Sequence, residues 1–312
     1  MRTRPLRRAL TVIAVLAASA GAPATAHAAV RDVWIAAVPT NFNIVPSEAD
    51  RITDQRFDPA ETLFPTVVYR RTTPGWRRPL RNSPARNVGR DAIPGPLIHA
   101  RVGDRIRVHF KNLDNFYKRP HSMHFHGVRY RPSSDGSFVP GITGPDGNVK
   151  FGHSWTYRLR AVAGSAGVWP YHDHSPSMME SIGGGMYGAL SILGRGERRP
   201  DREFVVFFSH TKRFETINGR AFVGNTPIYR SRVGQLIQWD VLAIGSDHHT
   251  FHVHGHRWRG PGGVPQDTRT LGPAESFRVR FREKEPGIWL YHCHREDHME
   301  RGMIGLYSVK RR

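Results

Sequence analysis

The chain has 312 residues, of which 38% are hydrophobic and 23% charged, and its 46 Lys and Arg against 26 Asp and Glu give a net charge of +20. That length fits two domains of ordinary size. The single cysteine excludes a disulfide within the chain. Past the N-terminal region, no segment reaches the ~18–20 consecutive apolar residues of a membrane-spanning helix.

The positive charge comes almost entirely from arginine. A basic chain can bind nucleic acid or another polyanion. Here the arginines are scattered along the sequence and no nucleic-acid-binding motif accompanies them. The sequence therefore predicts a solvated basic surface and no nucleic-acid partner. Attraction to anionic cell-wall material or to anionic substrates stays open as an alternative.

Residues 1–29 have the three parts of a secretion signal: a start with four arginines, an apolar stretch over 9–20, and a small-residue cleavage site at 24–26 or 26–28. The pair Arg7-Arg8 leaves twin-arginine export open. We expect an exported protein with no membrane partner once the signal is removed.

Short alternating stretches follow at 105–110, 156–160, 204–208 and 277–281, separated by Gly, Pro and Asn. No long helical period interrupts them. Alternation of apolar and polar residues is typical of half-buried strands, so the sequence predicts an all-β fold. Residues 72–91 and 132–152 are predicted to be exposed loops.

The chain also repeats itself. Residues 167–174 recur at 287–294, and Ser154-Trp155 recurs as Ser276-Phe277. The His-x-His-Gly of 124–127 recurs at 252–255, and Val102-Gly103 as Val233-Gly234. Four features in one order at a nearly constant offset indicate two copies of one β-sandwich domain. We predict domains over 30–196 and 197–312, joined by the polar linker 194–201.

The only cysteine, Cys293, stands in a dense run of metal-binding residue types. His298 follows five residues later and Met303 ten residues later. A thiolate, two imidazoles and a weak axial thioether are the ligands of a mononuclear blue copper site, and His249 is the candidate second imidazole. A buried inert cysteine is the alternative.

Four pairs of histidines each place two imidazoles on one face of a strand, because side chains alternate faces. Eight imidazoles exceed the four ligands of a structural zinc site and suit a cluster of several coppers. Cys293 would point to the opposite face from its two neighbours and so connect the blue copper to the cluster. The pairs are His124 and His126, His172 and His174, His252 and His254, and His292 and His294.

The two copies differ at the thiolate position. The first copy has Asp173 where the second has Cys293, and Met178 where the second has His298. Gly183 stands opposite Met303. The first domain is therefore predicted to lack a blue copper site while keeping its paired imidazoles.

These motifs resemble the multicopper oxidases, and the length and two-copy layout are similar to the small two-domain bacterial laccases. The resemblance covers 94–303. It implies two cupredoxin-like Greek-key domains and a homotrimer whose three-copper cluster lies between the first domain of one subunit and the second domain of its neighbour. It also implies four coppers per subunit: one type 1, one type 2 and a binuclear type 3 pair.

Carried over position by position, the resemblance assigns the type 2 copper to His124 and His252. It assigns the type 3 pair to the other six imidazoles. The catalytic residues would include Cys293, which passes electrons through His292 or His294 to the cluster. The type 3 ligands would be His126, His172, His174, His254, His292 and His294.

Three further residues are candidates for proton or electron transfer. Asp135 and Asp267 align with acidic residues near the cluster of similar enzymes and are expected to be proton relays. A turn-forming aspartate is the alternative for each. Tyr130, four residues after His126, is a candidate electron or hydrogen-bond donor, with a core tyrosine as the alternative. The remaining eight histidines, His121 among them, have no predicted role as ligands, although His256 is near enough in sequence to hydrogen-bond the cluster ligands.

Three functions fit these residues. The first is a laccase-like oxidase that couples oxidation of phenols or aromatic amines to reduction of O2 to water. The second is a ferrous or cuprous ion oxidase, for which Glu296, Asp297 and Glu300 beside His298 would supply carboxylates. The third is a copper-binding protein without turnover. The absence of a blue copper site from one domain but not from the other argues against this third function.

Overall fold

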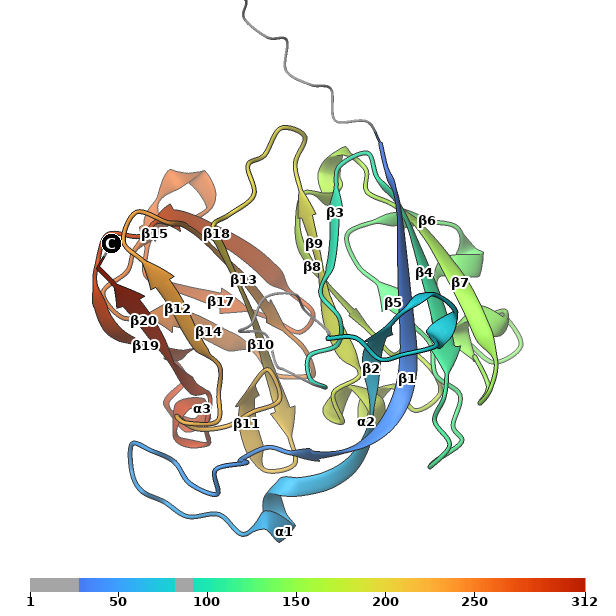
Figure 1. The fold of residues 1–312 in the computed structure, drawn as a ribbon, viewed down its shortest axis with the longest axis horizontal. Coiled ribbons are helices and arrows are strands. Elements are labelled where there is room, and N and C mark those ends of the chain that lie inside the picture. The colour runs from blue at the N-terminus through green and yellow to red at the C-terminus, as the bar shows by residue number, and fades with distance from the viewer. Residues whose placement is uncertain (1–27, 82–91, 312) are drawn as a thin grey trace, which may run out of the picture.

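The computed structural model describes residues 28–81 and 92–311. The predicted signal at 1–29 lies almost entirely outside these residues, and so does part of the predicted loop at 72–91. The described chain is built mainly of strands (Figure 1). Within it, no helix combines the length and the apolar character needed to cross a membrane.

The first half of the chain forms two facing sheets. One has the strand order β2-β1-β4-β7-β6 and the other β3-β9-β8-β5. Its elements are β1 (Val30–Asn43), α1 (Pro59–Thr62), β2 (Leu63–Thr72), β3 (Ile98–Arg101), β4 (Arg105–Asn112), β5 (His124–Phe125), β6 (Arg129–Tyr130), β7 (Ser154–Arg160), β8 (Gly167–His172), α2 (Met178–Gly183) and β9 (Tyr187–Leu193).

The second half repeats this plan with sheets β11-β10-β13-β18 and β12-β20-β19-β14-β17, plus a ribbon of β15 and β16. Its elements are β10 (Arg202–Thr211), β11 (Phe214–Ile217), β12 (Ile228–Arg232), β13 (Leu236–Ala243), β14 (His249–Val253), β15 (Trp258–Arg259), β16 (Pro265–Gln266), β17 (Thr268–Leu271), β18 (Ser276–Arg282), β19 (Gly287–Cys293), α3 (Glu296–Glu300) and β20 (Ile304–Lys310).

The strand pairing is the same in both halves. β1 runs parallel to β4 as β10 does to β13, and β3 runs parallel to β9 as β12 does to β20. β8 lies between its antiparallel partners β5 and β9, and β19 lies in the same way between β14 and β20. The prediction of an all-β chain with two cupredoxin-like Greek-key sandwiches is confirmed.

Each sandwich encloses its own apolar core because its strands alternate inward and outward. In β4 the side chains of Ile106, Val108 and Phe110 are fully buried, whereas Arg105 and Arg107 are exposed. Tyr171 in the first core and Tyr291 in the second occupy equivalent places on the histidine-bearing strands β8 and β19. The cores therefore fix the strands that carry the predicted ligands.

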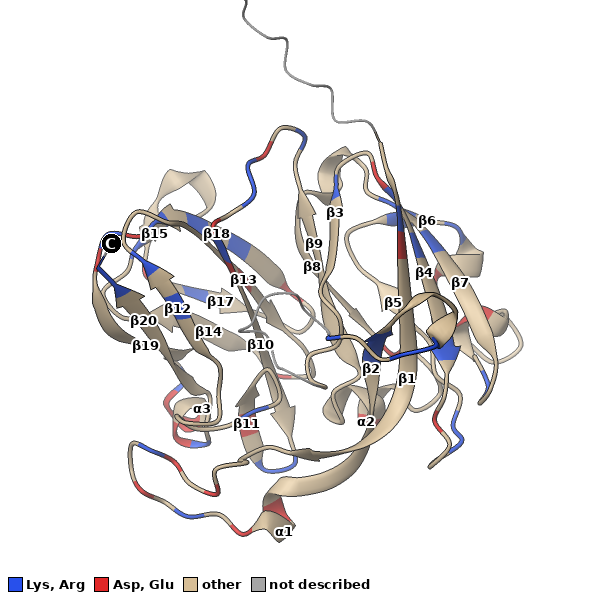
Figure 2. Cartoon of the chain, in the orientation of Figure 1, with Lys and Arg blue, Asp and Glu red and all other residues tan. Residues whose placement is uncertain are grey.

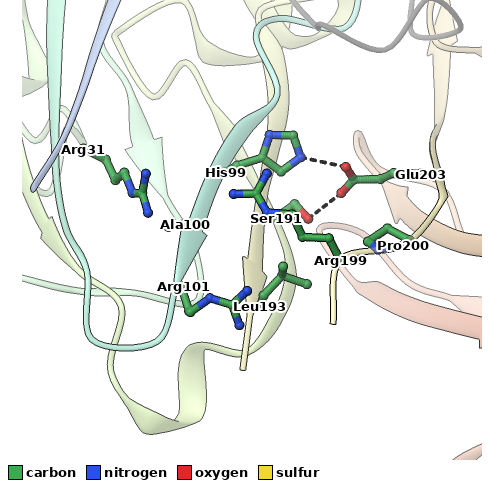
Figure 3. Close-up of a pocket in the computed structure, with 9 residues that line it drawn as sticks. All are labelled: Arg31, His99, Ala100, Arg101, Ser191, Leu193, Arg199, Pro200 and Glu203. Carbon is green, nitrogen blue, oxygen red and sulfur yellow. Dashed lines mark hydrogen bonds and ion pairs between the residues drawn. The ribbon is translucent and has the colours of Figure 1, made fainter. Parts of the chain in front are cut away.

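The two sandwiches pack through β8 and β9 of the first against β13 and β18 of the second (Figure 1). A partly buried polar network crosses this contact (Figure 3). The Glu203 carboxylate lies 2.6 Å from His99 Nε2 and accepts a hydrogen bond from Ser191 Oγ at 2.7 Å. Arg278 donates to Asp240 and to the Ile192 carbonyl. A hollow of about 170 Å³ lies beside His99 and Glu203.

Candidate metal centres

The predicted blue copper ligands converge at one end of the second sandwich. His249 opens β14, Cys293 closes β19, and His298 lies in α3. The Nδ1 atoms of His249 and His298 are 3.1 Å apart, and Cys293 Sγ is 3.7 Å from His298 Nδ1. All three side chains are buried. Two imidazole nitrogens and a sulfur thus face one small space inside the protein.

The chemistry of this donor set fits a copper ion. Burial, followed by the neighbouring His298, lowers the pKa of His249 to about 3, so its imidazole stays neutral and keeps a lone pair. Burial raises the pKa of the Cys293 thiol, but the Thr250 N–H donates to Sγ at 3.3 Å and favours a thiolate. Neutral imidazoles and a thiolate suit copper.

Met303 lies beside this space. Its side chain is fully buried, and its carbonyl accepts a hydrogen bond from the Cys293 N–H at 3.1 Å. The Met303 N–H donates in turn to the His298 carbonyl. Two of the three strong ligands, Cys293 and His298, are therefore tied to Met303 through the main chain, and the role of its thioether as the axial ligand stays a prediction.

The second predicted set lies on the other face of the same strands. In the pairing of β14 with β19, Phe251 is opposite Cys293 and His252 is opposite His292. Ligand atoms of His252, His254 and His292 all lie within 4.8 Å of one another. The His294 ring lies 5.4 Å from the His252 ring. Strand alternation thus separates the sulfur from the flanking imidazoles, as the sequence predicts.

The first domain holds a matching set of four imidazoles. His126 Nε2 lies 3.1 Å from His172 Nε2, and the His124 ring lies 5.1 to 5.5 Å from the other three rings. Burial, with a contribution from neighbouring imidazoles, lowers the pKa values of His126 and His172 to about 4. These side chains are neutral at ordinary pH and can act as metal ligands.

The orientation of four imidazoles is set by main-chain carbonyls. His124 Nδ1 lies 2.7 Å from the Asp135 carbonyl, and His252 Nδ1 lies 2.8 Å from the Asp267 carbonyl. His172 and His292 each place Nδ1 2.9 Å from the carbonyl of the next residue. A carbonyl only accepts, so each Nδ1 carries the proton and each Nε2 keeps its lone pair for a metal.

The backbone conformation and a neighbouring tryptophan require the glycine of each His-x-His-Gly motif. Gly127 and Gly255 have φ values of +71° and +69°, in the left-handed region. A side chain there would also meet an indole, since a Cβ on Gly127 would lie 2.0 Å from Trp169 and one on Gly255 would lie 2.6 Å from Trp289. Only glycine allows the chain to turn tightly over the tryptophan directly after the paired histidines.

The two sets of four imidazoles do not meet within one chain. Every ring contact among these histidines joins members of one set, as far as the described residues show. His254 and His294 are exposed. An eight-imidazole cluster therefore requires the second domain of another copy, and the predicted trimer stays a prediction.

Asp135 and Tyr130 both lie beside His124. The Asp135 Oδ1 atom is 3.6 Å from His124 Nδ1, and the Tyr130 ring lies 6.2 Å from the His124 ring. Burial, followed by the charge of Asp135 and a hydrogen bond to it, raises the pKa of Tyr130 to about 12. Burial works against ionisation of Asp135, but hydrogen bonds from Ser137 and the nearby His124 prevail and lower its pKa.

Asp267 occupies the corresponding place in the second domain. Its carboxylate accepts a hydrogen bond from Thr268 Oγ1 at 3.2 Å, and that hydroxyl lies 3.0 Å from His252 Nδ1. Each predicted relay aspartate thus touches the predicted type 2 ligand of its own domain. Their part in proton transfer is a prediction that this geometry permits.

Sequence reasoning placed Asp173 at the thiolate position of the first domain but missed its buried partners, His121 and Asp114. His121 lies 128 residues before His249, the same offset that relates the His-x-His-Gly motifs. Its Nε2 is 3.1 Å from the Asp114 carboxylate, and its Nδ1 is 3.6 Å from that of Asp173. Burial opposes protonation, but the two aspartates, Asp173 first, raise the pKa of His121. The repeat offset was the signal that could have found it.

Sequence reasoning also missed two carboxylates near His298. Ligand atoms of Glu215, Asp247 and His298 lie within 4.8 Å of one another. Among the predicted acids, Asp297 lies 3.8 Å from His298 Nε2, whereas no contact among the described residues joins Glu296 or Glu300 to His298. A pocket of about 330 Å³ opens here, and its lining includes Met178, Met179, His210, Glu215, Asp247 and Arg301.

His256 supports the second imidazole set from behind. Its Nδ1 donates to the His254 carbonyl at 2.7 Å, and its Nε2 lies 3.1 Å from the buried Glu283 carboxylate. Burial lowers the pKa of His256, but the bond to Glu283 prevails and raises it. The sequence placed His256 near enough to hydrogen-bond the cluster ligands, and the structure shows such a bond to the main chain of His254.

The fold and these donor sets define the class: a two-domain cupredoxin-like copper protein. Two family models, both described as multicopper oxidase, match residues 79–197 and 197–312. The chain therefore belongs to the multicopper oxidase family, which binds copper, and the predicted family is confirmed.

The individual proteins that resemble this chain share 30% of its sequence or less. A probable nitrite reductase-hydroxylamine oxidoreductase fusion protein of Kuenenia stuttgartiensis is 30% identical over 242 residues, which cover 70% of this chain and 28% of that protein. Human ceruloplasmin is 29% identical, covering 79% of this chain and 26% of its own length. This chain thus spans about a quarter of both relatives. A crystal structure of a multicopper oxidase has a TM-score of 0.68 at 24% identity, covers 90% of this chain and 89% of that one, and shows a shared fold.

Proposed function

We propose that the protein is a laccase-like oxidase that takes single electrons from small reducing donors and uses them to reduce O2 to water. The observation that carries the proposal is the position of Cys293. It faces His249 and His298 on one side of β19, while its covalent neighbours His292 and His294 face the second imidazole set. Coppers bound at these sets would supply the one-electron redox chemistry and the O2 chemistry.

The proposed type 1 copper site and its connection to the cluster both depend on Cys293. His249, Cys293, His298 and Met303 would hold the type 1 copper. The peptide bonds on either side of Cys293 would give a short covalent path to His292 and His294. Buried surroundings keep water away from Cys293 and favour a single geometry.

The other coppers, three of the proposed four per subunit, would sit between the four imidazoles of one subunit and the four of its neighbour. This arrangement supports a homotrimer, because the two sets face apart within one chain. Asp135 and Asp267 would pass protons toward the cluster, and Tyr130 would donate a hydrogen bond or an electron beside His124. Export of the protein, based on residues 1–29, also belongs to this proposal.

The experiment is oxygen uptake by the copper-loaded protein with a phenol as donor. Cys293→Ser should remove the intense visible absorption of thiolate copper and lower uptake by more than about 100-fold, the upper limit for losing a supporting contact. Met186→Leu, a buried change in the first domain, is the matched control. Full uptake by Cys293→Ser would show that the electron route is wrong. A particle mass other than three chains would exclude the trimer.

A second candidate function is oxidation of ferrous or cuprous ions, and one observation favours it. Glu215 is buried, its Oε2 has no hydrogen-bond partner among the described residues, and it lies 3.9 Å from His298 Nδ1. Asp247 and the thioethers of Met178 and Met179 line the same pocket. Carboxylates suit ferrous ion and thioethers suit cuprous ion.

Comparison of donors separates the two functions. If a metal ion is the donor, Glu215→Gln should lower kcat/KM for ferrous ion at least about tenfold and leave the phenol value within about threefold. Glu300→Gln, an exposed change in the helix that carries His298, is the control, because no hydrogen bond or ion pair among the described residues joins Glu300 to His298. Equal effects on both donors would argue against a metal-ion site in this pocket.

A further inference from the structure

The outer face of the first sandwich gathers arginines that are far apart in sequence. Arg105 and Arg107 lie on β4, Arg158 and Arg160 on β7, and Arg129 and Arg131 on and next to β6; all six are exposed. Figure 2 shows these strands side by side with their basic positions. The sequence predicted scattered basic residues, whereas the sheet collects these six, which we call the arginine face.

The register of the sheet places these residues directly opposite one another. Arg160 pairs with Arg105 on one side and with Arg129 on the other, and Arg107 pairs with Arg158. Directly opposed side chains on neighbouring strands lie ~4.5–5.5 Å apart, and like charges there repel. The arginine face therefore works against the stability of the sheet that carries it.

Neighbouring carboxylates relieve this repulsion at only one of the six arginines, as far as the described residues show. Arg107 pairs with Asp32 on β1. Among the contacts of the described residues, the guanidinium groups of the other five have no carboxylate partner. The alternate residues Ile106 and Leu159 are fully buried, so the arginines cannot turn inward without exposing the core. The charges stay at the surface.

The surface is hollowed at this place. A groove of about 570 Å³ is lined by all six arginines together with Val30, Tyr130, Ser133 and Ser134, and among the described residues no acidic side chain lines it. Guanidinium groups bind carboxylate or phosphate oxygens through two parallel N–H bonds. A groove with six such groups and no acid suits a ligand that carries several closely spaced oxyanions.

We propose that the arginine face binds a linear polyanion that has no bases, recognised by its row of phosphate or carboxylate groups. A single small anion would engage only one or two of the six cations. A nucleic acid is disfavoured because base stacking needs aromatic platforms, and the one aromatic ring in the groove, Tyr130, is partly buried and bonded to Asp135. The site lies apart from the donor pocket near His298 and does not rest on the proposed oxidase activity.

The test measures binding of long-chain inorganic polyphosphate and of polygalacturonate to the copper-loaded full chain over a range of salt concentrations. A face triple variant removes three arginines that no catalytic role involves. A control triple removes three exposed arginines elsewhere, so that net charge is matched. The face triple is Arg105→Ser, Arg158→Ser and Arg160→Ser, and the control triple is Arg56→Ser, Arg230→Ser and Arg232→Ser.

We expect the face triple to weaken binding of at least one polymer at least tenfold. Its slope of log K against log salt should become shallower by about 2, because each lost contact contributes about 0.7 for a single chain. The control triple should change affinity less than threefold. Loss of repulsion means that the face triple should melt no lower than the wild type. Which polymer binds more tightly identifies phosphate or carboxylate as the recognised group.

Three results would overturn the proposal. Equal loss in both triples would mean that only net charge matters. Single-stranded DNA binding tenfold more tightly than both polymers would indicate a nucleic-acid site. A change of oligomeric state in the face triple would indicate a contact between copies. Should the triple be poorly folded, Arg160→Ser alone, at the centre of one row, should weaken polymer binding at least threefold, and an unchanged affinity would contradict the proposal.

Discussion

The two domains use the same place in the same fold for different chemistry. In the second domain, His249 and Cys293 lie beside His298. In the first, His121 and Asp173 take the positions of His249 and Cys293, and Asp114 completes the group. One location therefore holds metal donors in one copy and a buried ion-pair network in the other.

One backbone contact explains what the fold requires at this place. The Thr250 N–H donates to Cys293 Sγ at 3.3 Å, and the equivalent Ser122 N–H donates to the Asp173 carboxylate at 2.7 Å. Both domains need an acceptor that can carry negative charge. The difference lies in the cation: the His121 imidazolium in the first domain, and a copper ion in the proposed state of the second.

The largest effect should come from removing that imidazolium. His121→Phe leaves two carboxylates buried without their cation and should destabilise the protein by about 3–5 kcal/mol. His249→Phe removes a neutral imidazole and should cost the metal-free protein less than about 2 kcal/mol, while abolishing the visible absorption of the copper-loaded form. Urea unfolding of the metal-free proteins measures both. Equal losses would mean that the two centres are not different in charge.

The pH dependence of stability should have opposite signs in the two kinds of centre. Burial lowers the pKa values of His249 to about 3 and of His292 to about 4, from 6.5. Below pH 6.5 these two imidazoles bind protons in the unfolded chain but not in the folded chain. The metal-free protein should therefore lose stability as pH falls below 6.5.

His121 should act in the other direction. Its raised pKa means that the folded chain holds a proton that the unfolded chain releases. Its stabilisation is complete below 6.5 and is lost as pH rises through the raised value. Urea midpoints of wild type and His121→Phe across this range provide the measurement. A constant difference between the two proteins at all pH values would contradict the assignment of a charged His121.

The smallest effect should follow from the axial position. Met303→Leu keeps the thiolate and both imidazoles, so the visible absorption should persist, and loss of the thioether should raise the reduction potential. Met186→Leu makes the same exchange at a buried site of the first domain and should leave the potential unchanged. Redox titration of the visible band compares them. An unchanged potential in Met303→Leu would place the thioether outside the copper site.

The fold and the ligand sets were predictable because both depend on local spacing. The offset between repeated motifs indicated two copies, and alternation along β19 separates Cys293 from His292 and His294. The family resemblance supplied the rest of the assignment. The separation of the two imidazole sets within one chain agrees with the expectation of a cluster between subunits, which stays a prediction.

Apart from His121, the features that sequence reasoning missed depend on tertiary pairing. Glu215 lies in β11, whereas His298 lies in α3 near the end of the chain. The two side chains come close only in the completed second sandwich. The arginine face draws on segments near 105, 130 and 160 that align only through strand register. No periodicity along the sequence encodes such neighbours.

The carbonyl contacts of His124, His172, His252 and His292 have a consequence for how the protein tolerates change. A carbonyl oxygen belongs to the main chain, so no point substitution at Asp135 or Asp267 deletes the acceptor that fixes the tautomer. The acidic side chains are thus free to be altered, in the laboratory or over generations, without misaligning the imidazoles. Substitutions there should therefore test the proposed proton supply while the imidazoles keep their orientation.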